Sequence, residues 1–209
     1  MEGVSVITKY FKNLDDLQLQ RFADLGELYA TWNERVNLVS RKDIDHLYER
    51  HILHSLSIAK FINFKSGARV MDLGTGGGFP GIPLAIFFPE VHFTLIDSIA
   101  KKMRVVDDLV QVLSLKNVST GVGRAENLKG SFDYVVSRAV APLSELYSWS
   151  GKSISKKQQH AIPNGIICLK GGDLRDELIP FKNRVEVHKI QDWFDEEFFE
   201  TKRLVYLPC

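Results

Sequence analysis

The segment Val70-Met-Asp-Leu-Gly-Thr-Gly-Gly-Gly-Phe-Pro-Gly-Ile-Pro83 is the most informative part of this chain, because glycine fills four of the five positions 74–78. A compact apolar strand, 69–73, precedes the glycines, and a helical pattern follows them as far as Phe88. Glycine lets the backbone approach a ligand closely, and the helix N-terminus behind the loop offers unpaired N–H groups. The stretch therefore predicts a strand, a loop and a helix arranged to bind a phosphate or a carboxylate.

Strands and helices alternate after this unit. The hydrophobic pattern predicts a helix over 99–115 and strands over 91–97, 118–122, 132–136, 166–170, 185–190 and 204–207. Alternation of this kind indicates an α/β fold of the Rossmann-like type, a mostly parallel sheet with helices on both faces. The last two strands are close enough in sequence to pair as an antiparallel arm at the end of the sheet.

The residues before the glycine stretch have helical spacing instead. Apolar residues between Leu14 and Phe64 form two stripes, with a break near 37–39 and a capping-box pattern from Ser40 to Asp43 that predicts the start of a new helix. We therefore expect two parts: a helical N-terminal extension, 1–66, packed on the core, and an α/β domain, 67–209.

Composition limits the class of protein. The 209 residues are 44% hydrophobic and 25% charged, and 27 Lys and Arg against 26 Asp and Glu give a net charge of +1, so any site for a polyanion has to be local. Cys168 and Cys209 are too few for a disulfide framework or a multi-cysteine metal site, and Cys168 sits in a strand where a core role is favoured. No apolar run approaches the ~18 residues that span a bilayer. We expect a cytoplasmic protein that is neither exported nor membrane-embedded.

Two classes of nucleotide cofactor use such a glycine loop. The dinucleotide fingerprint G-x-G-x-x-G fits only through Gly76, Gly78 and Gly81, a frame that starts two residues late relative to the strand. An NAD-linked oxidoreductase is the function that this frame would indicate.

A second glycine pattern starts directly at the end of the strand and needs no shift along the sequence. It reads acid-x-Gly-x-Gly-x-Gly, with Asp72 at the strand end followed by Gly74, Gly76 and Gly78, and it resembles the first motif of class I methyltransferases that use S-adenosyl-L-methionine (AdoMet). Asp97 ends the next strand, where an acid accepts hydrogen bonds from ribose hydroxyls. Because NAD enzymes place an acid there too, Asp97 does not separate the two classes, whereas Asp72 favours AdoMet.

Further short motifs follow one another along the chain. They are Trp32-Asn-Glu-Arg-Val-Asn-Leu38, Arg50-His-Ile-Leu-His-Ser-Leu56, Gly78-Phe-Pro-Gly-Ile-Pro83, Asp97-Ser98 with Lys101-Lys102, Gly123-Arg-Ala-Glu126, Ser137-Arg-Ala139 and Leu169-Lys-Gly171. Together they resemble the bacterial small-subunit ribosomal RNA guanine-N7 methyltransferases, also called the glucose-inhibited division protein B family. The resemblance implies a seven-stranded sheet with a helical N-terminal extension, AdoMet as cofactor, and a guanine of 16S rRNA, free or in the small ribosomal subunit, as substrate.

The same resemblance assigns individual residues. Gly74 and Phe79 match the AdoMet-binding loop of the family, Ala125 and Glu126 match the segment beside the adenine, and Arg138 matches an arginine at the mouth of the site. The chain departs from the family at His54, where many members have an acid, so no acid is present at this place to contact cofactor or RNA.

Methyl transfer to guanine N7 needs positioning more than proton transfer. N7 carries an in-plane lone pair and no proton, so no general base is required, and alignment alone supplies roughly 7 to 11 kcal/mol of barrier lowering. We therefore expect no acid–base catalytic residue and no metal. Arg138 is the candidate positioning residue, with a contact to phosphate or cofactor favoured over reading of the base and a surface salt bridge as the alternative.

Four residues are candidates for contact with RNA: Asn37, Arg50, Lys101 and Lys170. Lys170 ends the fifth strand, at the carboxyl edge of the sheet where ligands bind, and either contacts an RNA phosphate or is a solvated lysine. Asn37 and Arg50 either contact RNA or hold the helical extension on the sheet, and Lys101 opens a helix whose basic face is ordinarily solvated. DNA and membranes are not expected partners. A noncatalytic RNA-binding assembly factor that keeps AdoMet as a structural ligand is a further hypothesis.

Overall fold

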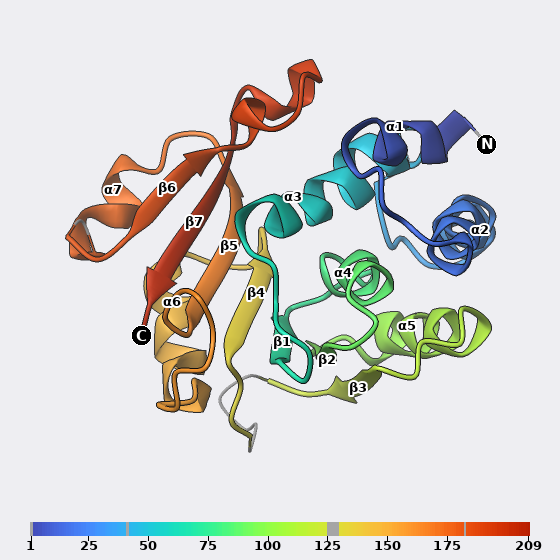
Figure 1. Cartoon of the computed structure of the whole chain (residues 1–209). Helices are drawn as coiled ribbons and strands as arrows, with labels where there is room; N and C mark the ends of the chain where they lie inside the picture. The colour runs from blue at the N-terminus through green and yellow to red at the C-terminus, as the bar shows by residue number, and fades with distance from the viewer. Residues whose placement is uncertain (1, 41, 125–129, 182) are drawn as a thin grey trace.

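Seven strands form one sheet in the order β3-β2-β1-β4-β5-β7-β6 in a computed structural model that describes residues 2–40, 42–124, 130–181 and 183–209 (Figure 1). The strands are β1 (Arg69–Leu73), β2 (His92–Asp97), β3 (Val118–Val122), β4 (Tyr134–Arg138), β5 (Gly165–Gly171), β6 (Glu186–Lys189) and β7 (Lys202–Pro208). The first five are parallel, and β7 pairs antiparallel with both β5 and β6. The expected seven-stranded, mostly parallel α/β fold is confirmed.

The strands lie close to their predicted positions, with one shift. The strand expected over 132–136 is β4, which begins at Tyr134, because Phe132 forms an isolated bridge with Ile154 before the ladder with β1 starts. The two C-terminal strands pair as an antiparallel arm. The arm is joined to the sheet by β7, which is inserted between β5 and β6 and pairs with β5 over its full length.

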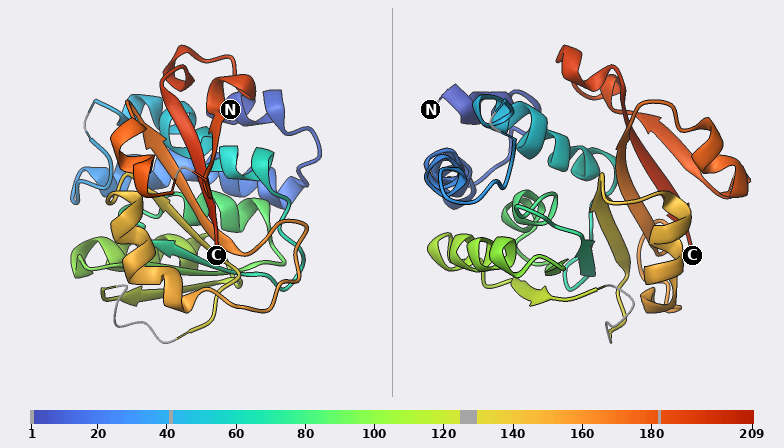
Figure 2. Two further views of the ribbon diagram at one scale, coloured as in Figure 1. Left: turned by 90° about the vertical axis from the view of Figure 1, so that its left-hand side faces the viewer. Right: turned by 180° about the vertical axis from the view of Figure 1, so that it is seen from behind.

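Helices cover both faces of the sheet (Figures 1 and 2). On one face lie α1 (Glu2–Tyr10), α2 (Asp16–Asn33), the 3-10 helix η1 (Ile44–His46), the π-helix η2 (Leu47–Leu53), α3 (His54–Phe61), α4 (Gly81–Phe87) and α5 (Ala100–Val112). On the other lie α6 (Leu143–Ser150) and α7 (Arg175–Leu178). The remaining 3-10 turns are η4 (Gly151–Ser153), η5 (Ile179–Phe181), η6 (Ile190–Asp192) and η7 (Glu197–Phe199).

The break after α2 has a clear cause. The side-chain oxygen of Asn33 accepts hydrogen bonds from the backbone N–H groups of Leu38 (2.9 Å) and Val39 (3.1 Å), which turns the chain at the place predicted. The capping box expected from Ser40 to Asp43 does not form. The Ser40 hydroxyl donates to the Asp43 carboxylate instead (2.6 Å), and the helix that follows begins as a 3-10 turn.

Two hydrophobic clusters hold the layers together. The larger contains side chains of α2, α3, α4 and α5 packed on the sheet, among them the fully buried Phe22 and Tyr29. The smaller lies under α6 and contains Cys168, which is fully buried as expected, and burial raises the pKa of its thiol to about 12. The N-terminal helices therefore share one core with the parallel half of the sheet.

The junction of β5 and β7 yields a stability prediction. A Cβ at Gly165 would collide with the backbone carbonyl of Leu207 and lie 3.0 Å from Cα of Pro208, so Gly165→Ala should lower the free energy of unfolding by about 2 kcal/mol or more. The control is Gly121→Ala in the edge strand β3, where a Cβ meets nothing within 4 Å; its effect should stay within about 0.5 kcal/mol. Urea denaturation measures both, and equal stability of the two variants would contradict this packing.

Candidate functional site

The glycine loop leaves the carboxyl end of β1 and is tied to the neighbouring strand. Gly74, Gly76 and Gly78 have φ values of 70°, 57° and 96°, a region that favours glycine. The N–H groups of Gly74 and Thr75 both donate to the carbonyl oxygen of Ile96, at 2.8 and 2.9 Å. The alternating glycines therefore let the chain reverse direction beside the end of β2.

Asp72 holds the glycine loop by hydrogen bonds on its buried side. Its carboxylate is fully buried, and Oδ2 accepts hydrogen bonds from the Thr75 hydroxyl (2.6 Å) and from the N–H of Gly81 (2.7 Å). A Cβ at Gly81 would lie 2.7 Å from Oδ2, so glycine is needed there for this close approach. Oδ1 has no partner among the described residues, and burial raises the pKa of Asp72 to about 7.

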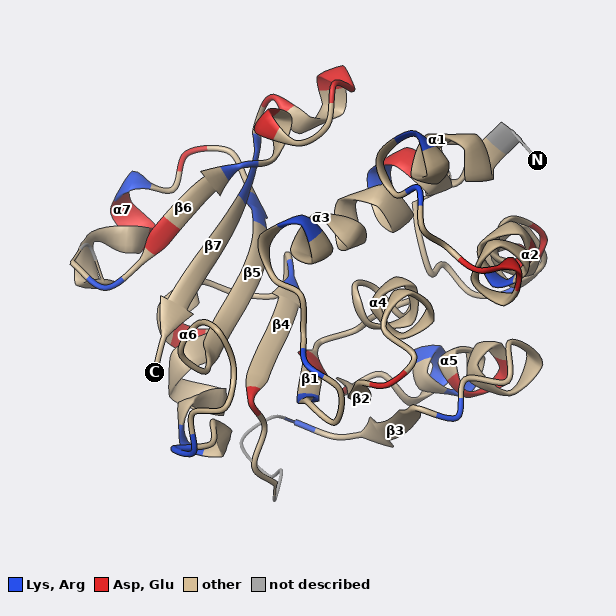
Figure 3. Ribbon diagram, viewed as in Figure 1, with Lys and Arg blue, Asp and Glu red and all other residues tan. Residues whose placement is uncertain are grey.

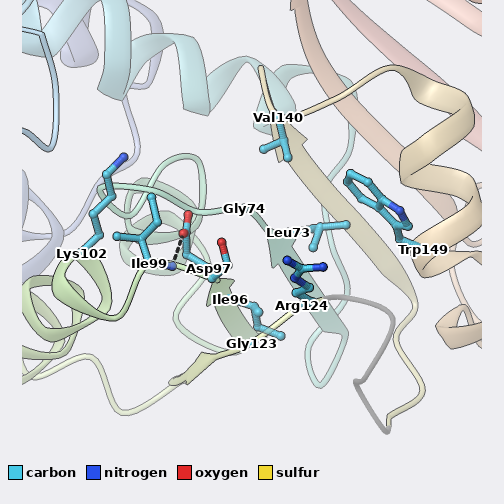
Figure 4. A pocket seen from close by; sticks show the side chains of 11 residues that line it. Leu73, Gly74, Ile96, Asp97, Ile99, Lys102, Gly123, Arg124, Val140 and Trp149 are labelled. Carbon is cyan, nitrogen blue, oxygen red and sulfur yellow. Dashed lines mark hydrogen bonds between the residues drawn. The ribbon is translucent and has the colours of Figure 1, made fainter.

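Asp97 holds the glycine loop by hydrogen bonds on the side that faces the cavity described below. Its Oδ2 accepts a hydrogen bond from the N–H of Gly76 at 2.8 Å. Its Oδ1 accepts one from the N–H of Ile99, also at 2.8 Å (Figure 4). The side chain is only partly buried. Each carboxylate oxygen keeps further acceptor capacity for the hydroxyls of a ligand.

A cavity of about 550 Å³, which we call the loop cavity, lies in front of these residues (Figure 4). Asp97 and Ile99 stand on one side of it, and Val140 and Trp149 on the other. The volume lies within the usual range of roughly 300 to 1,000 Å³ for small-molecule sites. Apolar walls suit a purine ring, a carboxylate acceptor suits ribose hydroxyls, and glycine backbone at the floor leaves space, so the residues fit the adenosine part of AdoMet.

Arg138 forms a second group at the end of β4. One guanidinium nitrogen lies 3.0 Å from Nδ1 of His51, another donates to the carbonyl oxygen of Arg50 (3.4 Å), and the guanidinium lies 4.8 Å from the ring centroid of Phe79. Because a guanidinium only donates, Nδ1 of His51 accepts and the imidazole is neutral. Burial and the charge of Arg138 lower the pKa of His51 to about 3. Burial lowers the pKa of Arg138 to about 10, which keeps it charged at neutral pH.

The predicted cofactor residues fall into three places. Gly74 and Asp97 line the loop cavity, while Asp72, Gly78 and Phe79 are buried beside it and shape the loop. Gly76 is held by Asp97 within the loop. Ala125 and Glu126 lie outside the described residues. Contact of each of these residues with AdoMet stays a prediction.

The predicted RNA-binding residues separate into two groups. Arg50 and Lys170 line one cavity of about 390 Å³ together with Arg138. Asn37 is exposed in the turn after α2 and Lys101 is exposed at the start of α5; neither is among the residues that line this cavity or the loop cavity. Asn37 and Lys101 therefore do not join Arg50 and Lys170 in either of these cavities.

Sequence reasoning missed several residues of both cavities. Trp149 lies in α6, which contains no recognisable sequence motif. The sequence therefore contains no signal that Trp149 lines the loop cavity. Lys202 and Phe198 line the second cavity from the segment at the start of β7. The register of β7 places Lys202 opposite Gly171, so knowledge of that pairing would have identified Lys202.

Two further findings concern only the described part of the chain. No three or more of its His, Cys, Asp and Glu side chains are grouped so as to hold a metal ion. None of its helices combines the length and the apolar character needed to cross a membrane.

A family model and two relatives similar to this chain share one description. A family model described as GidB, rRNA small subunit methyltransferase G, matches residues 18–206. Ribosomal RNA small subunit methyltransferase G of Bacteroides fragilis (strain YCH46) is 55% identical over 205 residues, which cover 98% of this chain and 92% of that protein. The protein of the same name from Bacteroides thetaiotaomicron is 56% identical over 203 residues, which cover 97% and 98%.

A solved structure adds a comparison of folds. The crystal structure of precorrin-6y C5,15-methyltransferase from Geobacter metallireducens GS-15 is 11% identical, with a TM-score of 0.55, over 75% of this chain and 87% of that chain. At this identity the likeness concerns the fold alone.

The buried carboxyl group of Asp72 predicts a dependence of stability on pH. Its pKa is raised in the folded protein, so it stabilises the fold below its unfolded pKa, and this contribution is lost as the pH rises through about 7. Asp72→Asn removes the titration. The stability of the wild type relative to this variant should therefore fall by on the order of 2 kcal/mol between pH 5 and 7.5. Urea unfolding at both pH values measures it, and a constant difference would show that Asp72 is ionised throughout.

Proposed function

The chain belongs to the rRNA small subunit methyltransferase G (GidB) family, and on this premise we propose that it transfers a methyl group from AdoMet to N7 of a guanine in 16S rRNA. The observation that carries the proposal is the loop cavity, in which an acid at the end of β2 faces a glycine loop at the end of β1, in a chain that matches the family from residue 18 to 206. The family match also favours methyl transfer over an NAD-linked oxidoreductase.

The residues of the loop cavity have distinct tasks in this proposal. AdoMet, when bound, supplies an activated methyl group on a sulfonium. Asp97 would accept hydrogen bonds from the ribose hydroxyls, and Ile99 and Trp149 would supply apolar contacts for the adenine. Asp72 and the hydrogen bonds to Ile96 keep the glycine backbone in place, so the loop needs no rearrangement on binding.

The groups at the end of β4 position the reactants and move no proton. His51 has a pKa of about 3 and its Nδ1 is occupied by Arg138, so this nitrogen does not act as a base at neutral pH. Arg138 stays charged and is held by the carbonyl oxygen of Arg50 and the ring of Phe79. Guanine N7 has a free lone pair and needs no base, so alignment near 3 Å is the requirement that the protein has to meet.

The substrate in this proposal is the small-subunit rRNA, free or within the small ribosomal subunit, and the reaction takes place in the cytoplasm. The cavity with Arg50, Lys170 and Arg138 lies at the same edge of the sheet as the loop cavity, where ligands bind in open α/β sheets. The local concentration of basic residues provides the attraction for RNA that the net charge of +1 does not.

The direct test is methyl transfer with labelled AdoMet to small ribosomal subunits and to protein-free 16S rRNA. Labelled 7-methylguanosine in nuclease digests is the expected product, at a single nucleotide. Label on another atom or base contradicts the proposed chemistry. Binding of AdoMet by calorimetry without transfer to either substrate identifies a noncatalytic assembly factor instead.

A pair of acid variants tests the cofactor site. Asp97→Ala should raise the dissociation constant for AdoMet at least about tenfold, because it removes the acceptor that faces the loop cavity and the bond that holds Gly76. Asp107→Ala is the matched control: Asp107 also accepts a hydrogen bond, from Thr120, yet it does not line the cavity. Calorimetry of both variants measures the constants, and equal values would remove Asp97 from the cofactor site.

A further inference from the structure

The second cavity has a strongly basic lining, and we call it the basic pocket. Its lining includes Arg50, His54, Arg138, Lys170, Phe198 and Lys202. One acid, Asp43, lines it as well and pairs with Arg50, and His51 completes its polar side chains. Figure 3 shows basic residues at the carboxyl ends of β4 and β5 and at the start of β7, the positions of Arg138, Lys170 and Lys202. Ala139 lines the basic pocket and the next residue, Val140, lines the loop cavity. A ligand in the basic pocket therefore lies beside a ligand in the loop cavity, separated by the end of β4.

Two positive charges of the basic pocket are not neutralised. Arg50 pairs with Asp43 (2.9 Å) and Lys170 pairs with Glu177 (2.8 Å). Arg138 and Lys202 form no ion pair with any acid in the described part of the chain. The ammonium of Lys202 lies 4.5 Å from the ring centroid of Phe198, which orients it without compensating its charge. The pocket is therefore suited to an anion.

His54 adds a hydrogen-bond acceptor to this pocket. Its side chain is 6% exposed, and Nε2 has no hydrogen-bond partner. Burial lowers the pKa of His54 well below its usual value, so the ring is neutral. A neutral imidazole has one donor nitrogen and one acceptor nitrogen, and Nε2 is the nitrogen without a partner. In the tautomer with the proton on Nδ1, Nε2 offers a lone pair to a hydrogen-bond donor.

A hydrogen-bond donor of the basic pocket, Nε of Arg50, also has no partner. Nε of Arg50 is buried and has no partner, although Nη1 of the same guanidinium bonds to Asp43. A buried N–H without an acceptor costs about 1 to 3 kcal/mol, and so does an unpaired acceptor such as Nε2 of His54. One ligand that offers both an acceptor and a donor would satisfy both groups.

We propose that the basic pocket binds one phosphate and one ribose 2′-hydroxyl of RNA, on a nucleotide adjacent to the methylated guanine. Arg138, Lys202 and Nε of Arg50 donate to the phosphate, and the 2′-hydroxyl donates to Nε2 of His54. The 2′-hydroxyl is the group that distinguishes RNA from DNA, so the pocket selects the sugar as well as attracting the backbone. The inference rests on the proposed function, because it assigns a substrate contact beside that site.

The phosphate contact is tested with Lys202→Ala. The expected result is a KM for protein-free 16S rRNA raised about fivefold or more, with unchanged AdoMet affinity, and a salt dependence of RNA binding whose slope falls by about 0.7 to 1. The control is Lys116→Ala, an exposed lysine before β3, at the opposite end of the strands, which should change none of these. Unchanged KM and slope in Lys202→Ala would overturn the phosphate contact.

The sugar contact is tested with fluorescein-labelled single strands of one mixed sequence in ribose, deoxyribose and 2′-O-methyl form. The wild type should bind the ribose strand at least about fivefold more tightly than the other two, since neither offers a 2′-hydroxyl donor. His54→Phe should bring all three affinities together, and His54→Gln, which keeps an acceptor, should retain part of the preference. Equal affinities in the wild type would overturn the sugar contact even if the variants fail to fold.

The proposed function and the assignment of the basic pocket can be contradicted separately. If the wild type transfers no methyl group to rRNA, the proposed function fails. If the wild type methylates rRNA while Lys202→Ala and His54→Phe, both folded by circular dichroism, keep the wild-type KM and sugar preference, only the assignment of the basic pocket fails.

Discussion

The buried carboxyl group of Asp72 is the constraint on which the site depends. A buried carboxyl group is destabilising unless hydrogen-bond donors are close to it. The donors to Asp72 are the hydroxyl of Thr75 and the N–H of Gly81 at the start of α4. These two bonds connect the end of β1, the loop and the following helix into one unit. The direction of α4 and the position of the glycine backbone follow from them, and so does the location of the loop cavity.

Asp97 and Arg138 complete the site on either side of this unit. Asp97 holds the loop by the N–H of Gly76 and faces the loop cavity, whereas Arg138 is held against Phe79 and His51 at the edge of the basic pocket. Helical segments before β1 supply His51 and the acceptor on Arg50, so the N-terminal helices are part of the site as well as of the core. The family to which the chain belongs gives this arrangement its chemistry.

Much of this arrangement is encoded locally and was predictable from the sequence. The glycine loop, the strands before and after it, and the acids Asp72 and Asp97 are recognisable because strand ends, turns and caps depend on residues close together in the chain. The insertion of β7 between β5 and β6, and the contribution of Lys202 and Trp149 to the two cavities, depend on pairing between distant segments. The π-helix before α3 has no pattern that separates it from an ordinary helix.

The most direct measurement of the central claim is a crystal structure of the protein with S-adenosylhomocysteine, the product of the methyl donor. We expect density in the loop cavity, with ribose hydroxyls on the carboxylate of Asp97, the base against Ile99 or Trp149, and the bonds from Thr75 and Gly81 to Asp72 unchanged. Density at another place, or a loop that gives up its bonds to Asp72 in order to bind, would contradict this expectation.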